Sequence, residues 1–127
     1  MRLIVVRHAE AAPGEPDALR ALTPQGRVDA AALGERLVTE GLEAVVSSPL
    51  LRARETAEAI AVASALAPEI DERLAPGATA DDLKAAAHGR GETVAVVGHQ
   101  PDLGLAVLAL TGEDHPFPPG GTAVVEL

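Results

Sequence analysis

Four consecutive aliphatic residues, Leu3-Ile4-Val5-Val6, stand between Arg2 and Arg7 near the start of the chain. A short apolar run that is rich in β-branched residues and bounded by charges is typical of a strand buried on both faces, as in a parallel sheet. Two similar runs follow, within Leu42 to Ser47 and over Thr93 to Val97. These three segments predict the central strands of a mostly parallel sheet.

The first predicted helix follows a loop over Ala11 to Arg20. Thr23-Pro24 supplies an N-cap and a proline at the first helical position. Gly41 stands where a left-handed residue would end the helix, so we expect a helix from Pro24 to about Glu40. The apolar residues that keep helical spacing within it are Val28, Ala31, Ala32 and Leu37.

Three further helices are predicted downstream. Ser48-Pro49 repeats the signal of an N-cap followed by proline, and Pro68 ends the helix that follows. Thr79-Ala80-Asp81-Asp82 resembles a capping box, and Pro101 marks the start of the last helix. The three helices are expected to end near Ala67, His88 and Gly112.

The order of the elements predicts the fold class. Glu69 to Leu74 is a further strand candidate, and a final strand is expected over Ala123 to Leu127. Strands and helices alternate, which indicates an α/β fold: a three-layer α/β/α sandwich with a mostly parallel central sheet. A chain of 127 residues fits one domain over 1–127. The segment from Leu74 to Thr93 has room for one short helix, so no large cap subdomain is expected.

Composition narrows the classes of function. The chain has 19 acidic and 10 basic residues, a net charge of −9, which disfavours nucleic acid and anionic membranes as partners. Its single aromatic residue, Phe117, disfavours modules that stack bases on rings. The absence of cysteine excludes a thiolate nucleophile and a Cys-based metal site. With no apolar leader or membrane span, we expect a cytoplasmic protein, and we expect a monomer.

Residues with ionisable or hydrogen-bonding side chains follow three of the predicted strands. The first strand ends in Arg7-His8-Ala9-Glu10, the second leads into Ser48-Pro49-Leu50-Leu51-Arg52, and the fourth ends in Gly98-His99-Gln100-Pro101. The carboxyl ends of parallel strands meet at one edge of a sheet, where helix N-termini also point. We therefore expect these groups to outline a pocket for an anion.

Each of these residues also has a structural interpretation. A histidine at a strand end is more often a structural or surface residue, and Arg7 could simply flank a buried strand. Arg52 could pair with Glu55 or Thr56 along a helix. An arginine near the start of a helix opposes the helix dipole, however, and this favours an anion-binding role for Arg52.

Metal and nucleotide cofactors are not expected. The remaining histidines, His88 and His115, are interpreted as surface residues, and no two histidines have the spacing of a metal site. Neither the glycine pattern of a dinucleotide-binding turn nor that of a P-loop is present. The chemistry is therefore assigned to the side chains alone.

Taken together, the motifs resemble those of the histidine phosphatase superfamily, also called phosphoglycerate mutase-like. The segments that carry the resemblance, in order along the whole chain, are Arg7–Glu10, Leu22–Gly26, Ser48–Ala57 and Gly98–Pro101. The short length and the stretches Arg20–Thr23 and Leu74–Gly77 are most similar to SixA-type phosphohistidine phosphatases.

The resemblance implies a role for each matching residue. His8 would be the nucleophile that accepts the phosphoryl group and is then regenerated by water. Arg7 and Arg52 would bind the phosphoryl oxygens, and His99, protonated or at least donating a hydrogen bond, would complete the clamp. The residues expected to contact the substrate around this clamp are Arg20, Glu10, Gln100 and Ser48.

The resemblance is incomplete at the general acid. Larger relatives use a carboxylic acid after the third strand, and the segment Asp71–Gly77 has no match to it. Glu10, Glu72 and Asp17 are the candidates by proximity. Phosphohistidine expels an imidazole, which needs a dedicated acid less than an alkoxide does.

The leading prediction is therefore a phosphatase that removes the phosphoryl group from phosphohistidine on a protein. Two alternatives stay open at this point. One is a phosphatase for a small molecule, such as a nucleotide, a sugar phosphate or a phosphoanhydride. The other is a module that binds a phosphorylated ligand without turnover.

Overall fold

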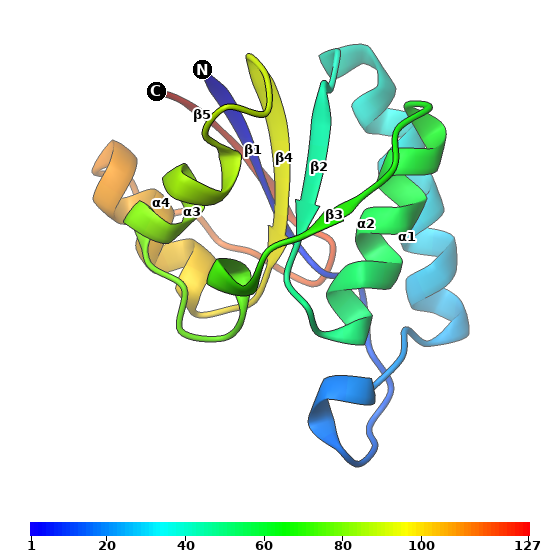
Figure 1. Cartoon of the computed structure of the whole chain (residues 1–127). Helices are drawn as coiled ribbons and strands as arrows, with labels where there is room; N and C mark the ends of the chain where they lie inside the picture. Colours follow the sequence, from blue (N-terminus) through cyan, green and yellow to red (C-terminus); the bar gives the residue numbers. More distant parts are fainter.

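A five-stranded sheet forms the centre of the structure, a computed structural model that describes residues 1–127 (Figure 1). The strands are β1 (Arg2–Arg7), β2 (Ala44–Ser47), β3 (Glu69–Ile70), β4 (Thr93–Gly98) and β5 (Thr122–Glu126). The α-helices are α1 (Pro24–Leu37), α2 (Leu51–Ala63), α3 (Ala80–Ala87) and α4 (Asp102–Thr111). Short 3-10 helices cover Asp17–Leu19, Val38–Glu40 and Glu72–Leu74.

The strand order across the sheet is β3-β2-β4-β1-β5. β1 and β2 both pair in parallel with β4, β3 pairs in parallel with β2, and only β5 is antiparallel. The register aligns Arg7 with Gly98 and Ser47 with Val97. The ends of β1, β4 and β2 therefore lie level with one another, and the segments that follow them start at the same edge.

The core lies on both faces of the sheet. Leu3 and Val5 pack with residues of α3 and α4, whereas Ile4 and Val6 pack with residues of α1 and α2. Successive side chains of a strand point to opposite faces, so a fully apolar strand serves two cores at once. The predicted three-layer α/β/α arrangement is confirmed.

The buried face of α1 differs from the predicted one. Val28, Ala31 and Ala32 are exposed, and the helix instead buries a stripe that includes two glycines. The buried residues are Gly26, Ala30, Leu33, Gly34 and Leu37. Of the predicted residues Leu37 is buried; the rest of the contact surface is made by Ala30, Leu33 and the two glycines, which lack a side chain and let neighbouring backbone come close.

The close contact at Gly34 leads to a stability prediction. A β-carbon at this position would lie 2.6 Å from the carbonyl oxygen of Ala59 in α2. Gly34→Ala is therefore expected to lower the free energy of unfolding by about 1–3 kcal/mol, although alanine is the better helix former. Chemical denaturation measures the change. Glu35→Ala, at an exposed site of the same helix, is the control and should stay within about 0.5 kcal/mol; an equal effect of both substitutions would contradict the packing argument.

The boundaries of α2 also differ from the prediction. The helix begins at Leu51, with Leu50 as its N-cap; the Ser48 hydroxyl lies ahead of the helix, where it accepts from the N–H of Leu50 and is also bonded to His99. It ends at Ala63 and not near Ala67. Ala65 adopts a left-handed conformation (φ 56°), and its backbone turn closes the helix several residues before Pro68.

The other elements follow the predictions within a few residues. Gly41 and Gly112 are left-handed C-caps, and Thr79 and Asp82 form the expected capping box. Pro101 is the N-cap of α4 and not its first residue. The third strand is shorter than expected, because a 3-10 helix replaces the second half of the segment from Glu69 to Leu74.

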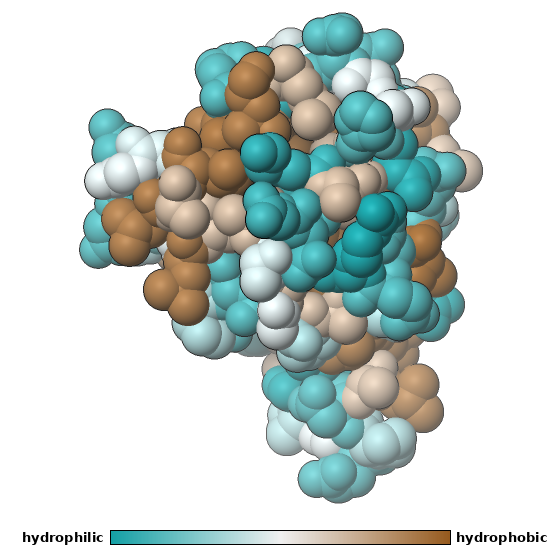
Figure 2. All heavy atoms as spheres, turned by 60° about the vertical axis from the view of Figure 1, so that its left-hand side comes forward, coloured by the Kyte–Doolittle hydropathy of each residue, from teal (hydrophilic) through white to brown (hydrophobic).

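The 3-10 helix Asp17–Leu19, which was not predicted, lies in a loop that projects from the body of the molecule, at the bottom of Figure 1. Exposed apolar residues of α4 include Leu105 and Leu108; Figure 2 turns the α3 and α4 side forward and shows apolar atoms gathered beside a hydrophilic area. None of the helices combines the length and apolar character needed to cross a bilayer.

Candidate active site

Three strand ends and one helix start bring the predicted site residues together. His8 directly follows β1, His99 directly follows β4, Ser48 directly follows β2, and Arg52 lies in the first turn of α2. The rings of His8 and His99 are 5.3 Å apart between centroids and are tilted by 54°. Residues 91 positions apart in the chain thus become neighbours because β1 and β4 are paired in parallel.

The ring of His8 is held in one tautomer. Its Nδ1 lies 2.7 Å from the carbonyl oxygen of Ala9. Because a carbonyl oxygen only accepts hydrogen bonds, Nδ1 carries the proton, and the lone pair of the neutral ring is on Nε2. Burial lowers the pKa of His8, and the charges of Arg52 and Arg7 lower this pKa further. The ring is therefore neutral at pH 7, which leaves Nε2 as a free nucleophile.

The ring of His99 is buried, with 5% of the residue exposed. Its Nε2 lies 2.7 Å from Oγ of Ser48, and the same Oγ accepts a hydrogen bond from the backbone N–H of Leu50. The Nδ1 atom is buried and has no hydrogen-bond partner. Burial, with the charges of His8 and Arg52, lowers the pKa of His99 to about 4, so this ring is also neutral at pH 7 in the free protein.

Arg7 is anchored on one side only. Its Nη1 donates to the carbonyl oxygen of Phe117, 2.9 Å away, in the loop before β5. That loop is held in place because the N–H of Gly120 donates to the carbonyl oxygens of Arg7 and His8. The Nε atom of Arg7 is buried and has no partner. Arg7 thus has a buried donor without a partner, just as His99 has a buried ring nitrogen without one.

Arg52 is buried, with 9% of its side chain exposed, and it is held by a single residue. Its Nη1 donates to the backbone carbonyl of Asp17 at 3.0 Å, and its Nη2 donates to the Asp17 carboxylate at 3.2 Å. The arginine is thus fixed in orientation by the projecting loop. This contact links the loop Ala11–Arg20 to the start of α2.

Thr56 joins the His8 loop to α2. Its Oγ1 accepts from the backbone N–H of Ala9 at 3.0 Å and donates to the carbonyl oxygen of Arg52 at 2.9 Å. Because the residue is completely buried, the two bonds hold His8 and Arg52 at a fixed separation. Sequence reasoning considered Thr56 only as a helical neighbour of Arg52; a threonine on the buried face of the helix was the available signal.

The remaining predicted residues divide into two groups. Ser48 lies in the site through its bond to His99, and Arg20 lies at its edge, where its Nη1 donates to the Asp17 carboxylate. The side chain of Glu10 instead accepts from the hydroxyl of Thr23, and the amide oxygen of Gln100 accepts from the backbone N–H of Gly104 in α4.

None of the three candidate general acids is well suited to donate a proton to the leaving group. Glu72 is exposed in its 3-10 helix, and Glu10 is engaged at the start of α1. Hydrogen bonding to Arg20, together with the charge of Arg52, lowers the pKa of Asp17. A carboxyl group with a lowered pKa is ionised at neutral pH and is therefore a poor proton donor. The structure contains no cluster of side chains suited to a metal ion.

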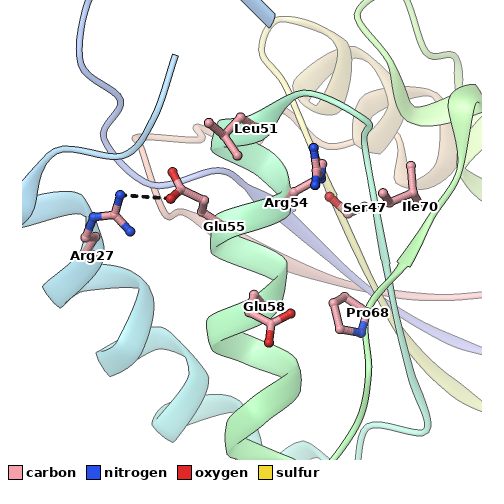
Figure 3. Close-up of a pocket in the computed structure, with 8 residues that line it drawn as sticks. All are labelled: Arg27, Ser47, Leu51, Arg54, Glu55, Glu58, Pro68 and Ile70. Carbon is pink, nitrogen blue, oxygen red and sulfur yellow. Dashed lines mark ion pairs between the residues drawn. The ribbon is translucent and has the colours of Figure 1, made fainter. Parts of the chain in front are cut away.

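A groove of about 380 Å³ lies between α2 and the segment around β3 (Figure 3), outside the strand-end cluster, which comprises Arg7, His8, Arg52 and His99. The residues that line it are Arg27, Ser47, Leu51, Arg54, Glu55, Glu58, Pro68 and Ile70. An ion pair of 2.9 Å between Arg27 and Glu55 crosses from α1 to α2 at one side of it. Neither histidine of the strand-end cluster lines the groove, so it is separate from the candidate site.

Sequence comparison shows which known proteins the chain resembles. The profile of the histidine phosphatase superfamily (branch 1) matches residues 3–76. An uncharacterised protein of Picosynechococcus sp. is 38% identical over 114 residues, which cover 82% of this chain and 69% of that protein.

Solved structures agree at the level of the whole fold. The structure of the protein histidine phosphatase SixA complexed with tungstate superposes with a TM-score of 0.87 at 29% identity, covering 100% of this chain and 88% of that one. A SixA protein from Agrobacterium tumefaciens gives a TM-score of 0.82 at 28% identity, covering 97% and 89%. The predicted phosphoglycerate mutase-like fold is therefore confirmed.

Proposed function

The chain belongs to the histidine phosphatase superfamily (branch 1), and from that premise we propose that this phosphatase removes the phosphoryl group from phosphohistidine on a protein. In this proposal, the catalytic residues are His8, Arg7, Arg52 and His99. Ser48 positions His99, and Arg20 lies at the edge of the site, where it is bound to the Asp17 carboxylate.

One observation carries the proposal: two buried nitrogen atoms without hydrogen-bond partners belong to Arg7, which directly precedes His8, and to His99, whose ring lies 5.3 Å from that of His8. Buried polar atoms in proteins nearly always have partners, and those that do not often point to a ligand. The Nε of Arg7 and the Nδ1 of His99 are such atoms. A phosphoryl group offers only acceptor oxygens, so it satisfies both donors. The tungstate in the SixA structure is an oxyanion of similar shape.

The neutral ring of His99 acts as a donor through its hydrogen-bond partner. When the hydroxyl of Ser48 donates to Nε2, the ring proton lies on Nδ1. Since the Ser48 oxygen already accepts from the N–H of Leu50, its own proton is available for this bond. His99 then donates from Nδ1 to a phosphoryl oxygen without carrying a full charge.

The first chemical step transfers the phosphoryl group to His8. Its Nε2 lone pair forms a bond to phosphorus while the bond between phosphorus and the substrate imidazole breaks. The substrate ring carries a proton on its other nitrogen, so it takes the electron pair of the broken bond and leaves as a neutral imidazole, while His8 becomes a phosphoimidazolium that keeps its Nδ1 proton. One P–N bond is exchanged for another, so a strong general acid is not needed. The guanidinium groups of Arg7 and Arg52 stabilise the charge on the equatorial oxygens.

The second step regenerates the enzyme. A water molecule attacks the phosphorus atom, a P–O bond forms and the P–N bond to His8 breaks, so the products are orthophosphate and the free ring. The same arginines stabilise this transition state. The hydrogen bond from Nδ1 of His8 to the Ala9 carbonyl persists through both steps and keeps Nε2 as the reacting atom.

The decisive experiment compares substrates at equal concentration. Phosphate release is measured from a protein phosphorylated on histidine and from a panel of phosphate monoesters and phosphoanhydrides. We expect the phosphohistidine protein to give the highest kcat/KM. Fast hydrolysis of one small ester together with none of phosphohistidine would assign the chain to the small-molecule class instead. Tight binding without turnover of any compound would indicate a binding module.

The lowered pKa of His8 predicts the pH dependence of the reaction. The nucleophile must be neutral, and burial and the nearby arginines place its pKa below the usual value of 6.5. The value of kcat/KM should therefore rise with pH through a point below 6.5 and be level at neutral pH. Initial rates between pH 4.5 and 8, corrected for the ionisation of the substrate, measure this profile.

The variant His88→Gln is the control for this profile. His88 is exposed at the end of α3, so its loss should leave the acid limb unchanged. A limb centred at or above pH 6.5 in the unmodified enzyme would contradict the assignment of His8.

A further inference from the structure

The Asp17 carboxylate bridges two arginines at the proposed phosphoryl site. Its Oδ1 accepts from Nη1 of Arg20 at 3.1 Å, and its Oδ2 accepts from Nη2 of Arg52 at 3.2 Å. It is the only acidic residue that forms an ion pair with Arg7 or Arg52. A negative charge therefore lies against the guanidinium that is proposed to hold the substrate anion.

A carboxylate and a phosphoryl group use the same chemistry to bind arginine. Both present acceptor oxygens to the planar fork of a guanidinium, with similar geometry. Arg52 has 9% of its side chain exposed and cannot turn to serve the two ligands separately, whereas Asp17 has 62% of its side chain exposed. Any anion that binds Arg52 must therefore compete with the Asp17 carboxylate for the positive charge of the guanidinium.

The net charge of the site also indicates that Asp17 and a bound phosphoryl group act on the same arginines. Arg7, Arg20 and Arg52 provide three positive charges, and both histidines are neutral at pH 7. Asp17 is ionised, because hydrogen bonding to Arg20 and the charge of Arg52 lower its pKa. The net charge of plus two matches a phosphoryl dianion; without Asp17 the site would carry an excess of positive charge.

We propose that Asp17 is an internal competitor that weakens the binding of inorganic phosphate at Arg52 and so favours release of the product. The inference rests on the proposed phosphoryl site. Each catalytic cycle ends with orthophosphate against the same arginines, and a site with three unopposed cations would retain it. Asp17 thus exchanges some affinity for faster release.

An alternative is that Asp17 only orients Arg52. Two substitutions separate orientation from competition. Asp17→Asn removes the charge but keeps the backbone carbonyl that binds Nη1 and one side-chain oxygen that can accept from Arg52, while an amide NH2 group replaces the other oxygen. Asp17→Ala removes the charge and the side-chain acceptor together. Competition predicts tighter phosphate binding in Asp17→Asn, whereas a purely orienting role predicts unchanged or weaker binding.

The test is direct titration of the unphosphorylated protein with inorganic phosphate in a calorimeter. We expect Asp17→Asn to lower the Kd for phosphate by about three- to tenfold, the effect of removing one partly exposed competing charge. Asp17→Ala should tighten binding less, because Arg52 also loses part of its support. A Kd for Asp17→Asn that is equal to or higher than that of the unmodified protein would overturn the inference.

Glu15→Gln is the matched control. Glu15 lies in the same loop, is exposed and has no ion pair, so its substitution removes the same charge from the same region without altering a contact to Arg52. We expect its phosphate Kd to stay within about twofold. An equal tightening by Glu15→Gln and Asp17→Asn would indicate a general effect of net charge and would overturn the role of Asp17.

Calorimetry does not depend on turnover, so failure of this inference and failure of the proposed function give different results. If the unmodified protein binds no phosphate, the phosphoryl site itself is wrong. If it binds phosphate and hydrolyses phosphohistidine while Asp17→Asn leaves the Kd unchanged, only the role of Asp17 is wrong. If Asp17→Asn tightens phosphate binding but phosphohistidine is not hydrolysed, the inferred role of Asp17 holds and the proposed phosphohistidine substrate is wrong.

Discussion

His8→Ala is expected to abolish turnover of a phosphohistidine protein, with a loss in kcat of at least about a thousandfold. The reason is that no other side chain near the two arginines offers a free nucleophile: the Nε2 of His99 is bonded to Ser48, and the chain contains no cysteine. Without His8 the phosphoryl group has no covalent acceptor on the enzyme, and the remaining route is direct attack by water.

The loss should be in chemistry and not in binding. Arg7, Arg52 and His99 remain in His8→Ala, so inorganic phosphate should still bind with a Kd within about tenfold of the original value. Rapid quenching of the unmodified enzyme with a labelled substrate should trap a phosphoenzyme that is labile to acid, and the variant should form none. These two measurements separate the loss of the nucleophile from a loss of folding.

His88→Ala is the control for this experiment, because His88 is exposed and lies outside the strand-end cluster. It should retain full activity and the same phosphoenzyme. Turnover by His8→Ala at more than about a tenth of the original rate would contradict covalent catalysis by His8, and it would favour direct hydrolysis at the arginine clamp.

The central sheet could be predicted because its strands are unambiguous. Leu3 to Val6 and Val94 to Val97 are apolar at every position, so both faces had to be covered by helices, and the structure shows this. The close approach of His8 and His99 followed from the parallel pairing of those two strands. Both inferences needed only the order of elements and the rule that parallel strands end at one edge.

The errors arose where backbone or loop contacts override local signals. Two of the five buried residues of α1 are glycines, which give no apolar signal, so the exposed Val28 was assigned to the regular pattern in place of Gly34. Ser48 has the appearance of a helix N-cap, but its hydroxyl bonds to a histidine 51 residues away. Side-chain hydrogen bonds between distant segments leave no periodic signal.

The role of Asp17 could not be predicted from the sequence for the same reason. In the sequence it is one of several charged residues in a loop with two prolines, and its proximity to the site suggested only a general acid. The structure places it on Arg52 and Arg20, where its charge is stabilised and its proton is lost. A residue considered as a proton donor is thus found as an anion that faces the cations of the site.

Arg52→Lys is expected to reduce kcat/KM by about a hundredfold or more, although it preserves the positive charge. A lysine has one ammonium group and cannot both donate to the carbonyl and carboxylate of Asp17 and present a planar pair of N–H groups to the phosphoryl oxygens. The oxygens carry the developing charge, so a poorly placed cation costs more in the transition state than in the ground state. We therefore expect most of the loss to fall in kcat.

Arg54→Lys is the matched control for this substitution. Arg54 lies two residues further along α2, is exposed, and lines the separate groove of Figure 3 instead of the histidine cluster. It undergoes the same chemical change in the same helix and should keep kcat/KM within about twofold. If Arg52→Lys also stayed within threefold while thermal denaturation showed both variants folded, the bidentate role of Arg52 would be wrong. Charge alone would then be sufficient at this position, and the contact of Asp17 with the arginine fork would serve the stability of the loop and not the geometry of phosphoryl transfer.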